Sequence, residues 1–296
     1  MVTQELARQL AALTPRAALR AVQTILEQAG CPDADFDARE LYRMVSGRDP
    51  RLAAAPLPAP QAERLAELTA RRADREPLQY LAGEWDFLDF TLRVGPGVLC
   101  PRADSEVVCE TAVDLLRRAG KPDPLVLDLC AGTGCLGLGV RRFLPQARVF
   151  CVEKSPAALS YLLANTAGTG VAAVEADVLT YWQTLPPATV DLILCNPPYL
   201  TAAEMADLMP ETAREPAMAL DGGTDGLDFY RAIAANYRQT VRPGGSLVFE
   251  IGCAQRRAVE TILADNGWTG IESRRDYGGN DRAVWAFCPD GARKTS

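Results

Sequence analysis

Beyond Pro124 the sequence alternates between short apolar runs, many of them β-branched, and stretches with helical periodicity. Parallel strands need a crossover, usually a helix, to return the chain to the same end of a sheet, and such helices cover both faces. The clearest apolar runs are LVLDL, RVFCVE, VDLILC and SLVFEIG, and the last two runs, 270–275 and 282–288, leave no room for a helix between them. The pattern predicts an α/β fold with a mostly parallel sheet that an antiparallel hairpin closes.

Residues 1–75 have a different pattern, with helical periods and no strand signal. Three helices are expected there: one from Pro15 with Thr14 as cap and Gly30 past its end, one from Asp35 that stops at Gly47, and one over 60–73. In the second helix, Phe36 is expected on the apolar face with Leu41 and Tyr42. We therefore expect a small helical bundle, which is either a packing appendage or a module that binds a partner.

Three parts are expected along the 296 residues, which suffice for two domains with separate cores. Residues 1–75 form the bundle, 76–106 a linker with a β-hairpin, and 107–296 the α/β domain. The hairpin is inferred from Trp85 to Leu99, where apolar and polar residues partly alternate and the segment from Gly95 to Gly97 makes a turn.

The composition excludes several kinds of chemistry. The chain contains no histidine, the side chain that most often acts as general base, proton shuttle and metal ligand near neutral pH. Serine and cysteine triads and histidine-based zinc sites are therefore excluded. The nine cysteines lie in apolar segments without a Cys-x-x-Cys pair, so they are expected to be free thiols packed as small hydrophobic groups, and no metal is expected.

Charge and hydropathy limit the partners. The net charge of −7 argues against long nucleic acid. Residues 1–75 carry 11 basic and 10 acidic side chains, so the remainder carries −8, which favours a basic partner for the larger domain. No run approaches the roughly 18 apolar residues of a membrane span, and the first residues lack a secretory pattern. A cytoplasmic protein that contacts neither membrane nor nucleic acid directly is expected.

A crevice for an adenosine-bearing ligand is predicted where three strands end. The run from Val126 to Gly134 closes a buried strand in a glycine turn that opens a helix, so backbone N–H groups can approach a ligand. It lacks the third glycine of the dinucleotide fingerprint and the lysine of a P-loop. Glu153 ends the next strand and is expected to accept ribose hydroxyls, and Asp177 follows the third strand, where it is expected to meet an adenine edge.

The most specific signal is Asn196-Pro197-Pro198-Tyr199 at the end of the fourth strand. Two prolines remove two N–H donors, so the carbonyls of Asn196 and Pro197 are left to accept hydrogen bonds from a ligand. The side-chain oxygen of Asn196 adds a further acceptor, and the ring of Tyr199 can lie against a planar group. This combination favours a site that grips a planar NH₂ group.

Together these motifs resemble the class I S-adenosylmethionine-dependent methyltransferases that act on planar nitrogens. Within them, the chain is most similar to the HemK/PrmC family, the peptide chain release factor glutamine N5-methyltransferases. The resemblance covers most of 75–288 and rests also on REPLQYLAGEWDF, VLCPRADSE, EPAMALDGGTDGLDFYR and DYGGNDRAV. The chain departs from the family pattern at Ala103, Ala131 and Val178.

The resemblance implies a Rossmann-like sheet of seven strands, S-adenosylmethionine as cofactor with S-adenosylhomocysteine as product, and the glutamine of the Gly-Gly-Gln motif of class 1 release factors as acceptor. The helical domain would hold the rest of the release factor. Cofactor contacts are expected at Cys130, Ala131, Gly132, Thr133, Gly134, Glu153, Asp177, Val178 and Asn196. The acceptor is expected to bind Asn196, Pro197, Pro198 and Tyr199, and the catalytic groups are expected to be Asn196, Pro197 and Tyr199.

Three other functions are weighed. An adenine-N6 methyltransferase can use the same Asn-Pro-Pro-Tyr sequence, but the acidic composition and the absence of a basic target-recognition segment disfavour it. A glutamine methyltransferase of ribosomal protein L3 is disfavoured by the ALDGGTDGLDFYR stretch and the length of the first part. A module that binds release factors without catalysis is disfavoured because Asn196 to Tyr199 is intact.

Overall fold

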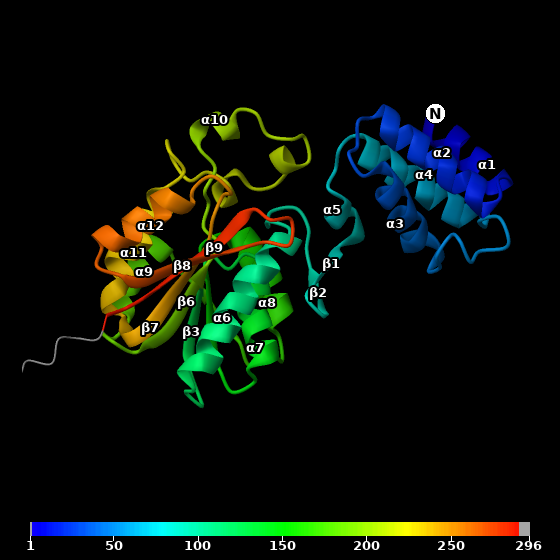
Figure 1. The fold of residues 1–296 in the computed structure, drawn as a ribbon. Coiled ribbons are helices and arrows are strands. Elements are labelled where there is room, and N and C mark those ends of the chain that lie inside the picture. Colours follow the sequence, from blue (N-terminus) through cyan, green and yellow to red (C-terminus); the bar gives the residue numbers. More distant parts are fainter. Residues whose placement is uncertain (1, 290–296) are drawn as a thin grey trace, which may run out of the picture. The chain divides into compact units, whose positions relative to one another are not determined.

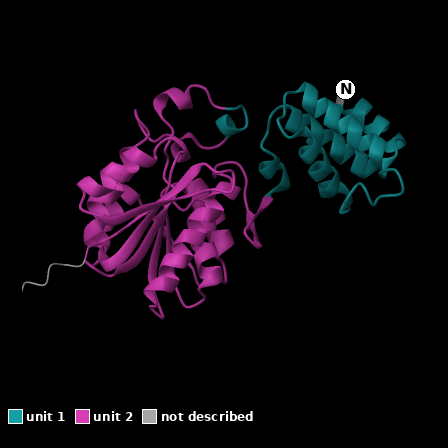
Figure 2. Ribbon diagram, in the orientation of Figure 1, with its two compact units in different colours: residues 1–83, 209–214 teal, residues 84–208, 215–296 magenta. Residues whose placement is uncertain are grey.

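The computed structural model describes residues 2–289 (Figure 1). The chain divides into two compact units, which Figure 2 colours separately: unit 1 is Met1–Gly83 with Met209–Arg214, and unit 2 is Glu84–Leu208 with Glu215–Ser296. This division assigns residues 84–106 of the expected linker to unit 2 and residues 209–214 to unit 1. None of the helices in the described range combines the length and apolarity of a bilayer span.

Unit 1 contains the helices α1 Val2–Ala12, α2 Pro15–Gln28, α3 Ala34–Ser46, α4 Ala59–Ala73 and α5 Leu78–Ala82. The signals around α2 act as the sequence predicts, because the Thr14 hydroxyl accepts the N–H of Ala17 and Gly30 follows the helix with φ +76°. The core of the unit is made of fully buried aliphatic side chains, among them Leu10, Val22, Leu26, Leu41 and Leu65.

Two features of unit 1 differ from the expectation. Helices α1 and α5 are not among the predicted helices. Phe36 is 43% exposed, so its predicted place on the buried face is wrong. The buried stripe of α3 runs through Ala34, Ala38 and Leu41, and a residue two positions after Ala34 is turned to the other side of the helix.

Residues 209–214 are held in unit 1 by charged hydrogen bonds. Glu211 accepts one from Arg72 at 2.8 Å and two from Arg75 at 2.7 and 2.6 Å. The buried guanidinium of Arg72 also donates to Asp37 at 2.8 Å. Burial tends to raise the pKa of Glu211, but the hydrogen bonds from the two arginines outweigh it and lower that pKa to about 2. The short 3₁₀ helix η3, Thr212–Arg214, completes this segment.

In unit 2, seven strands form one sheet in the order β5-β4-β3-β6-β7-β9-β8. The strands are β3 Leu125–Leu129, β4 Arg148–Glu153, β5 Ala172–Glu175, β6 Val190–Cys195, β7 Val241–Glu250, β8 Thr269–Arg275 and β9 Asp281–Phe287. Strands β3 to β7 pair in parallel, and β9 is antiparallel to both β7 and β8. The predicted fold class, with its closing hairpin, is confirmed.

Helices cover both faces of this sheet (Figure 1). One layer contains α6 Glu106–Ala119, α7 Cys135–Phe143 and α8 Pro156–Thr166, and the other contains α9 Val178–Tyr181, α11 Asp228–Asn236 and α12 Arg256–Asp265. Side chains alternate between the layers along each strand, so Val126 and Leu192 belong to the first core and Leu127 and Ile193 to the second. A further short helix, α10 Ala202–Met205, follows β6.

A two-stranded hairpin, β1 Glu84–Phe87 and β2 Phe90–Arg93, precedes α6. Its turn is at Leu88 and Asp89, where Leu88 has φ +54°. The rings of Phe87 and Phe90 pack edge to face beside the turn, with their centroids 5.9 Å apart. The predicted hairpin exists, but the turn at Gly95 to Gly97 is a separate turn that leads toward α6.

Candidate active site

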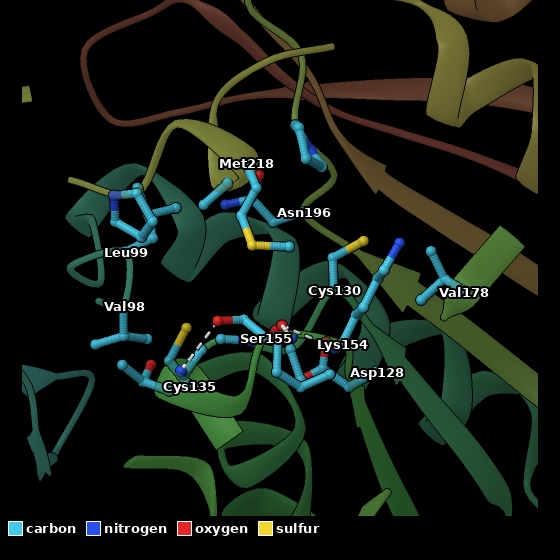
Figure 3. Close-up of a pocket in the computed structure, with 18 of the residues that line it drawn as sticks. Val98, Leu99, Asp128, Cys130, Cys135, Lys154, Ser155, Val178, Asn196 and Met218 are labelled. Atoms are coloured by element: carbon cyan, nitrogen blue, oxygen red, sulfur yellow. Dashed lines mark hydrogen bonds between the residues drawn. The ribbon is translucent and has the colours of Figure 1, made fainter. Parts of the chain in front are cut away.

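A cavity of about 300 Å³ lies in unit 2 where the parallel strands end (Figure 3). Its walls come from the turn after β3, the ends of β4, β5 and β6, and two loop regions within 97–105 and 216–229. Residues named from the sequence that line it are Cys130, Ala131, Gly132, Thr133, Glu153, Asp177, Val178, Asn196 and Pro198. Gly134, Pro197 and Tyr199 are outside its lining.

The turn after β3 depends on left-handed backbone. Cys130, Gly132 and Gly134 have φ values of +58°, +55° and +82°. A Cβ on Gly132 would meet only Val98, at 3.8 Å, so this Cα leaves space at the cavity. A Cβ on Gly134 would lie 2.6 Å from Leu162, so that glycine serves packing against α8.

The Asp128 carboxylate makes a hydrogen bond to the helix that follows this turn. It is fully buried near the end of β3, and its Oδ2 accepts the N–H of Gly137, in the first turn of α7, at 2.8 Å. Its other oxygen, Oδ1, has no hydrogen-bond partner among the described residues. Burial raises the pKa of Asp128 to about 7, and the N–H of Gly137 offsets only part of that rise.

Glu153, at the end of β4, connects two backbone segments that line the cavity. Its Oε2 accepts the N–H of Gly132 at 2.8 Å. Its Oε1 accepts the N–H groups of Lys154 and Ser155 at 2.8 and 2.7 Å. The carboxylate therefore links the glycine turn after β3 to the end of β4. It also lines the cavity.

Asp177, after β5, already has two local partners. Its Oδ1 accepts the N–H of Leu179 as the cap of α9 at 2.9 Å, and its Oδ2 pairs with the Nζ of Lys154 at 2.8 Å. Burial opposes ionisation, but the hydrogen bonds from Lys154 and Leu179, together with the charge of Lys154, outweigh it and lower the pKa of Asp177. Lys154 lines the cavity and was not singled out by the sequence analysis.

Asn196 lies at the end of β6 and lines the cavity, and Figure 3 draws it near Met218 at one end of the view, with Asp128 and Cys135 at the other. Tyr199 packs partly against the core between the sheet and α11. Burial, followed by the nearby Glu250 carboxylate, raises the pKa of Tyr199 to about 12. Tyr199 is therefore a neutral phenol at physiological pH and not a base.

Arg102 is a cavity residue whose role the sequence analysis does not predict. Its guanidinium donates to the Oε1 of Glu215 at 2.7 Å, and the Glu215 side chain is buried. The signal for Arg102 in the sequence is its place in the VLCPRADSE stretch, which is one of those that resemble the HemK/PrmC family. In the part of the chain that the structure describes, no group of three acidic or cysteine side chains is arranged to hold a metal.

Comparison with known proteins gives consistent matches along the chain. The family model for the PrmC N-terminal domain matches residues 17–83, and that for the Methyltransferase small domain matches residues 106–223. A release factor glutamine methyltransferase of Cereibacter sphaeroides is 40% identical over 277 residues, which are 92% of this chain and 98% of that protein. One of Mycolicibacterium smegmatis is 41% identical over 278 residues, 92% of this chain and 96% of that protein.

A solved structure extends the comparison to the fold. The catalytic domain of hMettl16, in complex with the MAT2A 3′UTR hairpin 6, matches 67% of this chain and 76% of that chain with a TM-score of 0.52 and 13% sequence identity. At this identity the match concerns the fold of the methyltransferase unit alone.

Proposed function

This chain belongs to the release factor glutamine methyltransferase family, and we propose that it methylates the side-chain nitrogen N5 of the Gly-Gly-Gln glutamine in class 1 release factors. The observation that carries this proposal is the 40% identity over 98% of a relative with that name. The other functions weighed from the sequence are not favoured by these relatives. The hMettl16 match is a match of fold and does not support adenine as acceptor.

The residues around the cavity fit S-adenosylmethionine as methyl donor. The open space at Gly132 allows a ligand to approach the backbone, and the Glu153 carboxylate is suited to ribose hydroxyls. Val178, Leu179 and Met218 offer an apolar wall for an adenine ring. When bound, S-adenosylmethionine supplies a methyl group made electrophilic by a positively charged sulfur.

Asp177 is proposed to bind the adenine of the cofactor, although both of its oxygens already accept a hydrogen bond. Its pair with Lys154 and its bond to Leu179 use one lone pair on each oxygen. A carboxylate oxygen has a further acceptor position, so Asp177 remains able to accept from the exocyclic amine of adenine. Asp177, with Lys154 as its partner, therefore belongs to the proposed adenine site.

The acceptor amide is proposed to be held by Asn196 and Pro197. An amide nitrogen is a weak nucleophile because its lone pair is delocalised into the carbonyl. Hydrogen bonds from its two N–H groups to the Asn196 side-chain oxygen and the Pro197 carbonyl would fix its plane and aim the nitrogen at the methyl group. Tyr199 would supply an aromatic surface beside the amide.

Proton transfer needs no strong base in this scheme. The nitrogen becomes acidic as its bond to the methyl carbon forms, so one of its protons can pass to water afterwards. This agrees with a chain that contains no histidine and with a Tyr199 phenol whose pKa is raised to about 12.

Unit 1 is proposed to bind the body of the release factor. One support is the match of the PrmC N-terminal domain to residues 17–83. A second is that unit 1 has a hydrophobic core of its own and contributes no residue to the lining of the cavity. Because release factors act in translation termination, the proposed place of action is the cytoplasm, without a nucleic acid or a membrane as direct partner.

The division of roles is tested with Asn196→Ala. Turnover on an unmodified release factor should fall at least about a hundredfold, because the grip on the amide is lost. Calorimetry should find S-adenosylmethionine affinity within about threefold of the unaltered protein. Equal losses of turnover and cofactor affinity would contradict the proposed role of Asn196.

A further inference from the structure

Gln255 does not line the cavity, but its side chain makes a hydrogen bond to the segment 196–199, which is proposed to bind the acceptor amide. Its Nε2 donates to the backbone carbonyl of Tyr199 at 2.8 Å and to that of Gly226 at 3.2 Å. Its Oε1 accepts the N–H of Gly252 at 3.0 Å and lies 3.4 Å from the hydroxyl oxygen of Tyr230. One side-chain amide thus connects two segments that are distant in the sequence, Tyr199 and residues 226–230, to the turn that precedes α12.

Three glycines leave the space that this arrangement needs. A Cβ on Gly226 would lie 2.3 Å from the Tyr199 oxygen and 2.7 Å from the Nε2 of Gln255. A Cβ on Gly222 would lie 2.7 Å from the Cα of Tyr199, and one on Gly252 would lie 2.9 Å from the Oε1 of Gln255. The backbone of Tyr199 is therefore enclosed at close range by two loops.

The loops themselves are fixed in place. The N–H of Leu200 donates to the carbonyl of Leu220 at 2.8 Å, and the N–H of Gly222 donates to the carbonyl of Leu200 at 2.9 Å. The hydroxyl of Tyr230 donates to the carbonyl of Glu250 at 2.9 Å, at the end of β7. Gln255 also precedes α12, and its backbone N–H donates to Gly252 at 2.9 Å.

We propose that Gln255 is a positioning residue for methyl transfer, which holds the Tyr199 carbonyl and thereby sets the direction of the Pro197 carbonyl and the Asn196 side chain. This inference rests on the proposed function. In the segment from Asn196 to Tyr199 the two central residues are prolines, so they have no N–H groups with which to fix the shape of the segment. A fixed external donor at its last residue takes over that task, and small errors in the angle of a reacting group cost much of the rate.

The test variant is Gln255→Met, which keeps the length of the side chain and removes its hydrogen bonds. We expect kcat on the release factor to fall at least about tenfold, while the KM for the release factor and the calorimetric affinity for S-adenosylmethionine stay within about twofold. If this variant does not fold, Gln255→Asn, which retains an amide one methylene shorter, replaces it with the same expected split.

The matched control is Asn266→Ala at the other end of α12. Asn266 donates to the carbonyl of Ile262 at 2.8 Å, so the control also removes a side-chain hydrogen bond of this helix, away from Tyr199. Its kcat should be unchanged. A folded Gln255 variant with unaltered kcat, or one that loses cofactor affinity as much as kcat, would overturn the inference. Absence of methylation by the unaltered protein would instead count against the proposed function.

Discussion

Glu153 accepts a hydrogen bond from the backbone N–H of Gly132 at 2.8 Å, which joins the end of β4 to the glycine turn after β3. The carboxylate thus shapes the cavity before any ligand arrives. For this reason its removal should affect both the turn and the proposed ribose contact.

Glu153→Gln should weaken S-adenosylmethionine binding by about tenfold or more, because an amide cannot accept all three N–H groups that the carboxylate now accepts. Isothermal calorimetry measures this. Glu175→Gln, at the exposed end of the neighbouring strand β5, is the control and should bind normally. Equal affinities for the two variants would contradict the role of Glu153.

Ala188→Gly should stabilise the protein by about 1 kcal/mol, because this exposed residue has a Cβ that is strained at φ +53°. Thermal or urea unfolding followed by circular dichroism measures the change. Cys130→Gly relieves the same kind of strain at φ +58° but also removes a thiol that packs against the core, so its gain should be smaller. Exposed Cys253→Ala should give none. No gain at either left-handed position would argue against strain there.

Glu250 should make unit 2 less stable as pH rises. Burial raises the pKa of Glu250 to about 7 from 4.5, although a hydrogen bond from Ser105 and the charge of Arg282 oppose the rise. Between these two pH values the folded state holds more protons than the unfolded state, so the free energy of unfolding falls with increasing pH. Glu250→Gln should reduce this fall by on the order of 1 kcal/mol.

Urea unfolding at several pH values between 5 and 8 tests this expectation. Glu272→Gln, on an exposed part of β8, should leave the pH dependence of the unaltered protein in place. A Glu250→Gln protein with the same slope as the unaltered one would show that Glu250 does not titrate in this range.

Glu211 should have the opposite effect on unit 1. Because hydrogen bonds from Arg75 and Arg72 lower its pKa to about 2 against the effect of burial, its contribution is present above pH 4.5 and is lost as the pH falls toward 2. Glu211→Gln should cost unit 1 on the order of 1 kcal/mol at neutral pH and nothing at the acid end. Exposed Glu63→Gln on α4 is the control, and a pH-independent cost would contradict the assignment.

The sequence predicts those parts of the fold whose signals are local. The alternating runs fix the five parallel strands β3 to β7 and the final hairpin, and Thr14 with Gly30 marks the limits of α2. The sequence predicts the turn of the first hairpin at the wrong place, at 95–97. The turn is at Leu88, which adopts φ +54°, and because glycine adopts such left-handed conformations far more readily than leucine, the glycines at 95 and 97 give the stronger turn signal.

Parts of the candidate site depend on contacts between distant residues, and no local pattern announces them. Gln255 reaches Tyr199 across 56 positions and Gly226 across 29. Lys154 pairs with Asp177 across 23 positions. A glutamine before a helix or a lysine after a strand is common in any α/β domain, so only the folded chain reveals these partners.

The proposed methylation is best tested by mass spectrometry of a purified, unmethylated class 1 release factor that has been incubated with this protein and S-adenosylmethionine. We expect a gain of one methyl group that peptide mapping assigns to the glutamine of the Gly-Gly-Gln motif, and a gain at least about a hundredfold slower with Asn196→Ala. A release factor that remains unmodified although S-adenosylmethionine binds, or a methyl group on another residue, would contradict the account.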